Sequence, residues 1–319
     1  ATTALLVWVM GERYWNTRLL LWLDAAGLVA FAVVGAAKTL ALGFPALVAI
    51  AMGVLTGTFG GIVRAVLANR PIVAERAMYF GSPGWIGGHA SPGLQAPGTR
   101  WFSAEGVTGS YFDTYLLLGN PSPEHTAHVN LRFLSRDGGV YRRGYEIAPA
   151  TRLTVNAEIA HPALADAEFS TVIDSDVPVV AERATYWGGA FPNWLDAHAA
   201  PAAAASYLKW GLADARVGGA EAFETWVLIA NEDPVRAAQV EMTFLTEEGA
   251  PVSRTVTVAP NSRYSVWLEQ DVPELTGRRA GLRLESANGV PIVVERAMYW
   301  STPRQAWAGG SSAPGAPLP

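Results

Sequence analysis

One ten-residue string, residues 291–300, limits what this chain can fold into more than any other feature, because it occurs three times. It reads Pro-Ile-Val-Val-Glu-Arg-Ala-Met-Tyr-Trp, and nearly the same residues occupy positions 178–187 and 71–80. The copies begin 107 and 113 positions apart (178 minus 71, and 291 minus 178), which is the length of one small domain. The chain is therefore a tandem repeat.

Each copy of the string predicts a β-strand, since β-branched and aromatic residues dominate it and a proline stands at its first position. Alternation along a strand points the glutamate and the arginine of each copy to opposite faces, so they need different partners. We predict structural ion pairs in every repeat and keep a ligand-binding or catalytic role as the less favoured alternative. The residues are Glu75, Arg76, Glu182, Arg183, Glu295 and Arg296.

Composition argues against several classes of function. A net charge of −5 with 16% charged residues gives no basic face for a nucleic-acid partner. The absence of cysteine excludes disulfides and thiolate metal sites. No glycine-rich phosphate loop, Ser-His-Asp set or recurring pair of carboxylates emerges. We therefore expect a protein that is not an enzyme and that has no catalytic residue, cofactor or metal site.

The first 70 residues form a hydrophobic segment. Residues 19–37 carry one charge, Asp24, and residues 40–63 carry none, so two consecutive runs have the length that crosses a hydrocarbon core. We predict a transmembrane helical hairpin that contacts the membrane through residues 19–63. The alternative is a buried helical hairpin in a soluble domain.

This segment resembles the second half of bacterial glycine-transporter-like membrane proteins, which are related to trimeric intracellular cation channels. The resemblance lies in residues 22–28, 31–36 and 53–64. It departs from the family at Ala65, where an Asp normally follows the Gly-Gly-x-x-Arg segment. The resemblance implies half of a transporter. Because such folds place their site between two repeats, transport would need a partner half.

Small and polar residues inside the segment have a simpler structural interpretation. Gly53, Gly57 and Gly61 are spaced four apart on one helix face and predict close helix packing. Asp24 and Arg64 are the polar residues of interest, Asp24 as a contact between helices or, alternatively, as a remnant of a transport pathway.

The distribution of positive charges and the type of β repeat predict opposite membrane topologies. Arginines 13, 18, 64 and 70 flank the hydrophobic runs, against Lys38 alone between them, so the positive-inside rule places the rest of the chain in the cytoplasm. The repeats described next argue for the outside of the membrane. The sequence leaves open whether the join near Asn69-Arg70 is natural.

Residues 71–319 contain two complete β units and the end of a third. Residues 112–120 and 223–231 align without a gap, from Phe-Asp-Thr-Tyr to Phe-Glu-Thr-Trp, and alternation and turn residues predict about seven short strands per unit. That pattern predicts immunoglobulin-like β-sandwiches in a mainly β protein. The expected divisions are 1–70 hydrophobic, 71–98 a last strand plus linker, 99–188 module 1, 189–205 linker, 206–301 module 2, and 302–319 a flexible tail.

The units resemble tandem repeats of bacterial secreted and surface proteins that carry Trp-aromatic-x-Ala-Glu-Gly and Glu-Arg-x-Met-Tyr-aromatic strings. Residues 101–106 carry the first string, and the resemblance covers roughly residues 71–310. It implies exported, non-enzymatic β-sandwiches in the cell envelope.

Loop aromatics give the one candidate ligand site. Trp85 with His89, and Trp194 with His198, recur at the same step of four, while Trp307 is followed by Ser311. We favour packing at module junctions over stacking on a polysaccharide. Asp113 and Glu224 also recur, and we expect them on a solvated face.

The first string has no complete unit ahead of it. Its residues Pro71, Val73 and Tyr79 could add a strand to another chain, giving filaments by strand donation. The favoured function is a structural or adhesive envelope protein that associates with itself or with other envelope proteins. A glycan-binding surface module and a transport component are the alternatives.

Overall fold

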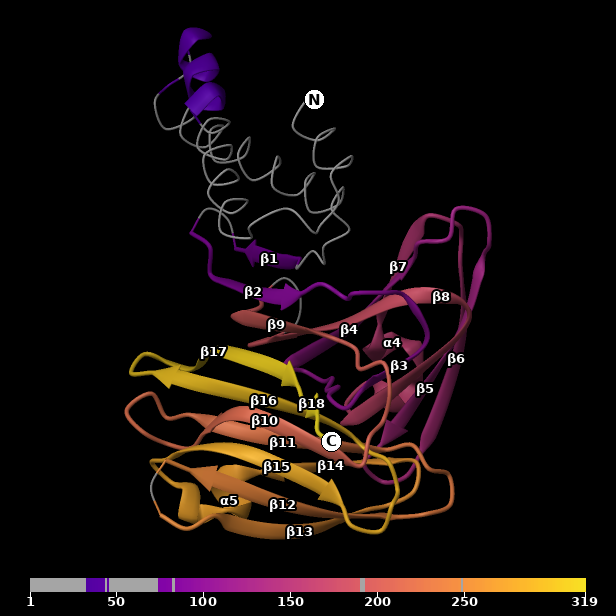
Figure 1. The fold of residues 1–319 in the computed structure, drawn as a ribbon, viewed down its shortest axis with the longest axis vertical. Helices are drawn as coiled ribbons and strands as arrows, with labels where there is room; N and C mark the ends of the chain where they lie inside the picture. Colours follow the sequence, from indigo (N-terminus) through magenta and orange to yellow (C-terminus); the bar gives the residue numbers. More distant parts are fainter. Residues whose placement is uncertain (1–32, 44, 46–73, 82–83, 190–192, 248) are drawn as a thin grey trace, which may run out of the picture. The chain divides into compact units, whose positions relative to one another are not determined.

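A computed structural model describes most of the β region and a short part of the N-terminal region. The described residues are 33–43, 45, 74–81, 84–189, 193–247 and 249–319. The chain divides into two compact units, Ala1–Val73 and Ala74–Pro319. The second unit is mainly β, with several antiparallel sheets (Figure 1).

The N-terminal unit contributes one described helix, residues 33–41. Over the part of the chain that the structure describes, no helix combines the length and the apolar character needed to cross a membrane. Several residues singled out in the sequence lie outside the described residues: Asp24, Gly53, Gly57, Gly61, Arg64, Pro71 and Val73.

Module 1 consists of two sheets that share one long strand. Its strands are β3 (Gly98–Ser103), β4 (Phe112–Asn120), β5 (Ala127–Ser135), β6 (Val140–Ile147), β7 (Thr151–Asn156), β8 (Phe169–Trp187) and β9 (Asp196–Pro201). The first half of β8 pairs with β5 and β3, and its second half pairs with β4 and β9. Strands β6 and β7 complete the outer edges by pairing with β5 and β4.

Module 2 repeats this arrangement with the long strand divided in two. Its strands are β10 (Lys209–Arg216), β11 (Glu224–Asn231), β12 (Ala238–Thr246), β13 (Val252–Val258), β14 (Ser262–Trp267), β15 (Arg279–Ser286), β16 (Val293–Thr302), β17 (Gln305–Pro314) and β18 (Ala316–Pro317). One sheet has the order β13-β12-β15-β10-β18 and the other β14-β11-β16-β17. The helices of the two modules are single turns, α4 (Ala157–Ala160) with η2 (Pro162–Leu164), and α5 (Leu268–Asp271) with η3 (Pro273–Leu275).

Each copy of the repeated string forms the first strand of a hairpin. The first repeat hairpin is β1 (Glu75–Phe80) with β2 (Gly87–Pro92), the second is the end of β8 with β9, and the third is β16 with β17. The register is the same in all three, because each glutamate lies opposite a proline: Glu75 and Pro92, Glu182 and Pro201, Glu295 and Pro314. Strand β2 contacts β9, and β9 contacts β17, so the three hairpins are stacked (Figure 1).

The second strands of these hairpins fall where the sequence predicts linkers and a flexible tail. Strands β2, β9 and β17 consist mostly of glycine, alanine, serine and proline, a composition that is typical of a linker. The stack explains this composition. A Cβ atom added at Gly310 would lie 2.8 Å from the ring of Trp187, and one added at Gly87 would lie 2.7 Å from the carboxylate of Asp196. Small residues are needed because another hairpin packs against each strand.

The hydrophobic core continues from one module into the other. Module 1 has its own cluster around Leu131, Phe133 and Phe169. The cluster of module 2 also includes Phe102, Leu134 and Trp187 of module 1. The two modules are therefore packed together by apolar side chains rather than joined only by a connecting segment.

Candidate functional site

The repeated arginine of one hairpin pairs with the repeated glutamate of the next. Arg76 Nη2 lies 2.8 Å from Glu182 Oε2, and Arg183 Nη2 lies 2.9 Å from Glu295 Oε2. The structure thus places these ion pairs between successive repeats, whereas the sequence predicts an ion pair in every repeat without identifying the partners. We call the contact of the first hairpin with module 1 the first junction, and the contact of the second hairpin with module 2 the second junction.

The second junction is a buried ion cluster. Arg183 is 1% exposed and also lies 2.6 Å from Glu105 Oε2, in the segment that follows β3. Glu295 accepts hydrogen bonds from the Ser103 hydroxyl at 2.9 Å and the Ala104 backbone N–H at 2.8 Å. The pair is therefore held by donors of module 1 as well as by opposite charge, which is what a buried pair needs to offset its desolvation.

Burial sets the protonation behaviour of this cluster. Burial raises the pKa of Glu105 and of Glu295, and the nearby Arg183 guanidinium opposes the rise in both. Burial also lowers the pKa of His198 well below its usual value, and Arg183 adds to that effect. His198 is thus neutral at neutral pH, with Nε2 lying 3.4 Å from Glu105 Oε1 and 3.3 Å from the Tyr299 hydroxyl.

Aromatic rings complete the second junction. The Trp187 and Tyr299 ring centroids lie 5.0 Å apart at an interplanar angle of 90°, and Trp187 Nε1 donates to the Trp307 carbonyl at 2.9 Å. Such edge-to-face pairs favour one relative orientation of the two rings. The junction is therefore specified by geometry as well as by apolar burial.

The loop tryptophans pack on their own hairpins and also against the neighbouring repeat, since the ring centroids of Trp194 and Phe80 lie 6.4 Å apart and those of Trp307 and Tyr111 lie 5.7 Å apart. Trp194 stacks on Tyr186 at 4.1 Å and donates to the Asp113 carboxylate at 2.5 Å. Trp307 likewise stacks on Tyr299 and donates to Glu224. Asp113 and Glu224 were expected on a solvated face. That prediction is wrong for Asp113, which is 5% exposed, while Glu224 is half-buried.

The first copy differs because no complete module precedes it. Trp85 and Tyr79 are each 66% exposed, with ring centroids 6.2 Å apart. His89, the counterpart of His198, is 9% exposed, and neither of its ring nitrogens has a hydrogen-bond partner. Burial lowers the pKa of His89 to about 4, with a further contribution from Arg76.

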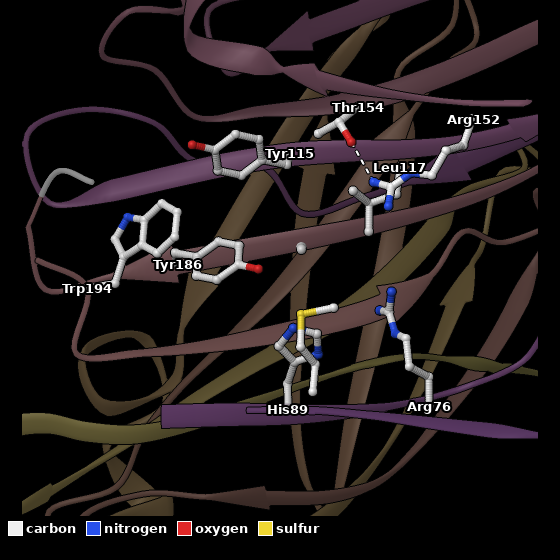
Figure 2. Close-up of a pocket in the computed structure, with 10 residues that line it drawn as sticks. Arg76, His89, Tyr115, Leu117, Arg152, Thr154, Tyr186 and Trp194 are labelled. Carbon is white, nitrogen blue, oxygen red and sulfur yellow. Dashed lines mark hydrogen bonds between the residues drawn. The ribbon is translucent and has the colours of Figure 1, made fainter. Parts of the chain in front are cut away.

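A cavity of about 390 Å³ lies at the first junction, between the first hairpin and strands β4, β7 and β8. Figure 2 shows Arg76 and His89 on one side of it and Arg152, Tyr115 and Tyr186 across from them. Arg152 Nη2 donates to the Thr154 hydroxyl at 2.6 Å. The cavity therefore combines two arginines, an unpartnered histidine and aromatic walls.

Sequence reasoning missed three residues that build the junctions. Arg263 donates to the Phe169 carbonyl at 3.0 Å and also to the Gly106 carbonyl, linking module 2 to module 1. Ser103 bonds to Glu295, and Arg152 lines the cavity. The sequence did indicate that the two arginines are equivalent. Gly119 and Ala230 occupy the same position in the two aligned repeats, and Arg152 and Arg263 lie opposite them in the paired strands. Repetition gave the position but not the partner in the neighbouring module.

Comparison with known proteins finds two kinds of similarity. The glycine transporter family matches residues 21–88. The UPF0126 membrane protein YvgT of Bacillus subtilis (strain 168) is 46% identical over 57 residues, which is 18% of this chain and 28% of that protein. The N-terminal segment is thus similar to UPF0126 membrane proteins, and the chain spans less than a third of the length of this relative.

The chain is also weakly similar to solved structures. The crystal structure of Thermotoga maritima 1070 aligns with 34% of this chain and 94% of its own, with 19% identity and a TM-score of 0.30. The B domain of a biofilm associated protein aligns with 76% of this chain and 84% of its own, with 8% identity and a TM-score of 0.20.

Proposed function

We propose that the protein is a non-enzymatic structural or adhesive component of the bacterial cell envelope. In this proposal, two immunoglobulin-like β-sandwich modules are docked rigidly on one another and are attached to the membrane through residues 19–63. One observation carries the proposal, the buried Arg183–Glu295 pair that joins the modules across a continuous apolar core.

Rigid docking is the property that a structural protein needs from its modules. Tandem domains usually move relative to each other unless their interface is large and apolar. Here the interface adds ion pairs at its rim: Arg100 Nη2 lies 2.5 Å and Arg132 Nη2 3.3 Å from Glu232 Oε2. Contacts at the centre and at the rim both oppose a hinge between the modules.

Attachment to a membrane is supported by the similarity of residues 21–88 to the glycine transporter family. An envelope location for the modules is supported by tandem repetition and by the resemblance to surface repeats. Protease treatment of intact cells tests it. We expect antibody against module 2 to lose its target before lysis, while a cytoplasmic marker survives. Modules that stay intact until the cells are lysed would contradict the proposed location.

Glycan binding remains a second candidate because Trp85 and Tyr79 are exposed side by side on the first hairpin. Exposed aromatic rings are suited to stacking on sugar rings. If the protein binds envelope polysaccharide in this way, Trp85→Ala abolishes its retention on the isolated polysaccharide. Trp307→Ala, which removes the half-buried counterpart, serves as the comparison. Retention that Trp85→Ala leaves unchanged would exclude this use of the hairpin.

A further inference from the structure

The two junctions can be compared position by position because the hairpins share one register. Arg76, His89 and Arg152 at the first junction correspond to Arg183, His198 and Arg263 at the second. At the second junction these three side chains converge on one short segment of module 1. Arg183 and His198 face the Glu105 carboxylate, at 2.6 Å and 3.4 Å, and Arg263 donates to the next carbonyl, that of Gly106.

At the first junction the same three positions surround a cavity. None of the described residues that line it is acidic. Arg76 has Glu182 as the counterpart of Glu295, but among the described residues it has no counterpart of Glu105. His89 is nine-tenths buried with both ring nitrogens unpartnered, although a buried polar group without a partner is costly. The first junction thus has the same three hydrogen-bond donors as the second, but none of the described residues supplies the carboxylate that Glu105 provides there.

We propose that this cavity binds a glutamate-bearing peptide segment, in the way that module 2 holds residues 102–107 at the second junction. The glutamate carboxylate lies between Arg76 and His89, and Arg152 donates to the peptide carbonyl that follows it. This inference goes beyond the proposed function and does not depend on where the cell keeps the protein.

Two observations favour a peptide over a small free carboxylate. A cavity of about 390 Å³ is far larger than a carboxylate requires, since one water occupies roughly 30 Å³ in the liquid. Strand β1 also has one edge to which no described strand is paired. Strand β8 pairs with β4 and β9, and β16 with β11 and β17, whereas β1 pairs only with β2 among the described strands. A peptide that continues past its glutamate can add to that edge.

The probe is a labelled synthetic peptide with the sequence of residues 99–109, and its binding to the 319-residue chain in detergent is followed by fluorescence anisotropy. We expect saturable binding. The Glu105→Gln peptide should bind roughly 10-fold to 100-fold more weakly, because hydrogen bonds to charged groups contribute about 1.5–3 kcal/mol. Equal binding of the two peptides would overturn the proposal.

The protein side of the contact is tested with Arg152→Met, since the one hydrogen bond that its side chain makes to the described residues is to Thr154 on the same strand. This variant should weaken the peptide roughly 10-fold, whereas Arg142→Met, an exposed arginine on β6, should not change it. Wild-type affinity in Arg152→Met would contradict the assigned site.

The NMR signal of His89 separates a peptide from a free carboxylate. Binding of the peptide should shift this signal, and acetate at the same concentration should not. A full shift of His89 with acetate alone would overturn the assignment to a peptide. If the peptide binds without shifting the His89 signal, it binds elsewhere on the protein, and that result would equally contradict the assigned site.

Discussion

At the scale of single residues, the same Arg–Glu contact occurs in two environments. The Arg183 and Glu295 side chains are each 1% exposed, whereas those of Arg76 and Glu182 are 35% and 24% exposed. Water screens the second pair and stabilises either partner when the other is removed. The buried pair has no such alternative, so the two arginines differ in their importance for stability although their sequence contexts are nearly identical.

Replacing Arg183 by methionine should therefore be far more costly than replacing Arg76. Arg183→Met leaves Glu105 and Glu295 unpaired and should lower the free energy of unfolding by about 3–5 kcal/mol. Arg76→Met should lower it by about 1 kcal/mol or less. Urea unfolding of the full chain, followed by tryptophan fluorescence, measures both. Equal losses in the two variants would show that burial does not decide the value of the pair.

His89 should titrate far below an ordinary histidine. Burial and the nearby Arg76 lower its pKa from 6.5 to about 4. Between these two values the unfolded chain binds a proton that the folded site refuses, so stability falls as the pH falls from about 6.5 to about 4. NMR titration of the imidazole signal measures the pKa directly. In Arg76→Met the pKa should rise, and an unchanged pKa would remove Arg76 as a cause.

At the scale of elements, the glycine- and alanine-rich strands of the hairpins are shaped by what packs on them. Strand β17 illustrates this at Gly310, where a Cβ atom would lie 2.8 Å from the Trp187 ring and 3.0 Å from the Tyr299 ring. Its counterpart in β9 is Ala197, where the aromatic residue of the preceding hairpin is the smaller Phe80. The close approach of Trp187 therefore accounts for the glycine at position 310.

The substitution Gly310→Ala should be destabilising by about 1–3 kcal/mol, because neither ring can move away inside the junction. Gly144→Ala on strand β6 is the matched control. The nearest atom to a Cβ there is the Asn130 side-chain oxygen at 3.6 Å, so the change should stay within about 0.5 kcal/mol. Thermal unfolding of both variants checks the difference, and a neutral Gly310→Ala would mean that the junction is loosely packed.

These strands also mark the limit of prediction from the sequence. The β-branched string at 291–300 and the alternation in Val129, Leu131 and Phe133 predict strands, and β16 and β5 lie there. Residues 305–314 carry no such pattern, because their pairing with β16 and the fit between hairpins determine the strand. The alternation of apolar and polar residues shows only which conformation a short segment prefers by itself. The partners of Arg183 lie 78 positions away at Glu105 and 112 positions away at Glu295, and no local pattern contains them.

At the scale of the whole β unit, the two modules should unfold together. Apolar residues of both modules form one cluster, and Arg183 of module 1 is held by Glu295 of module 2. Calorimetry of the full chain should show one transition for the β region. In Arg183→Met this transition should move to lower temperature and stay single, because one contact between the modules is lost while the shared apolar cluster remains. Two separate transitions in the unmodified protein would contradict the coupling.

The pairing of each arginine with the glutamate of the following repeat also has a bearing on copy number. In an array of any length, the glutamate of the first repeat and the arginine of the last repeat have no partner in this pattern. Every added copy contributes one more junction and no further end. The stability per copy therefore rises with the number of copies. A duplication in the gene lengthens the array at little risk, whereas a change at one arginine is felt by two neighbouring copies at once.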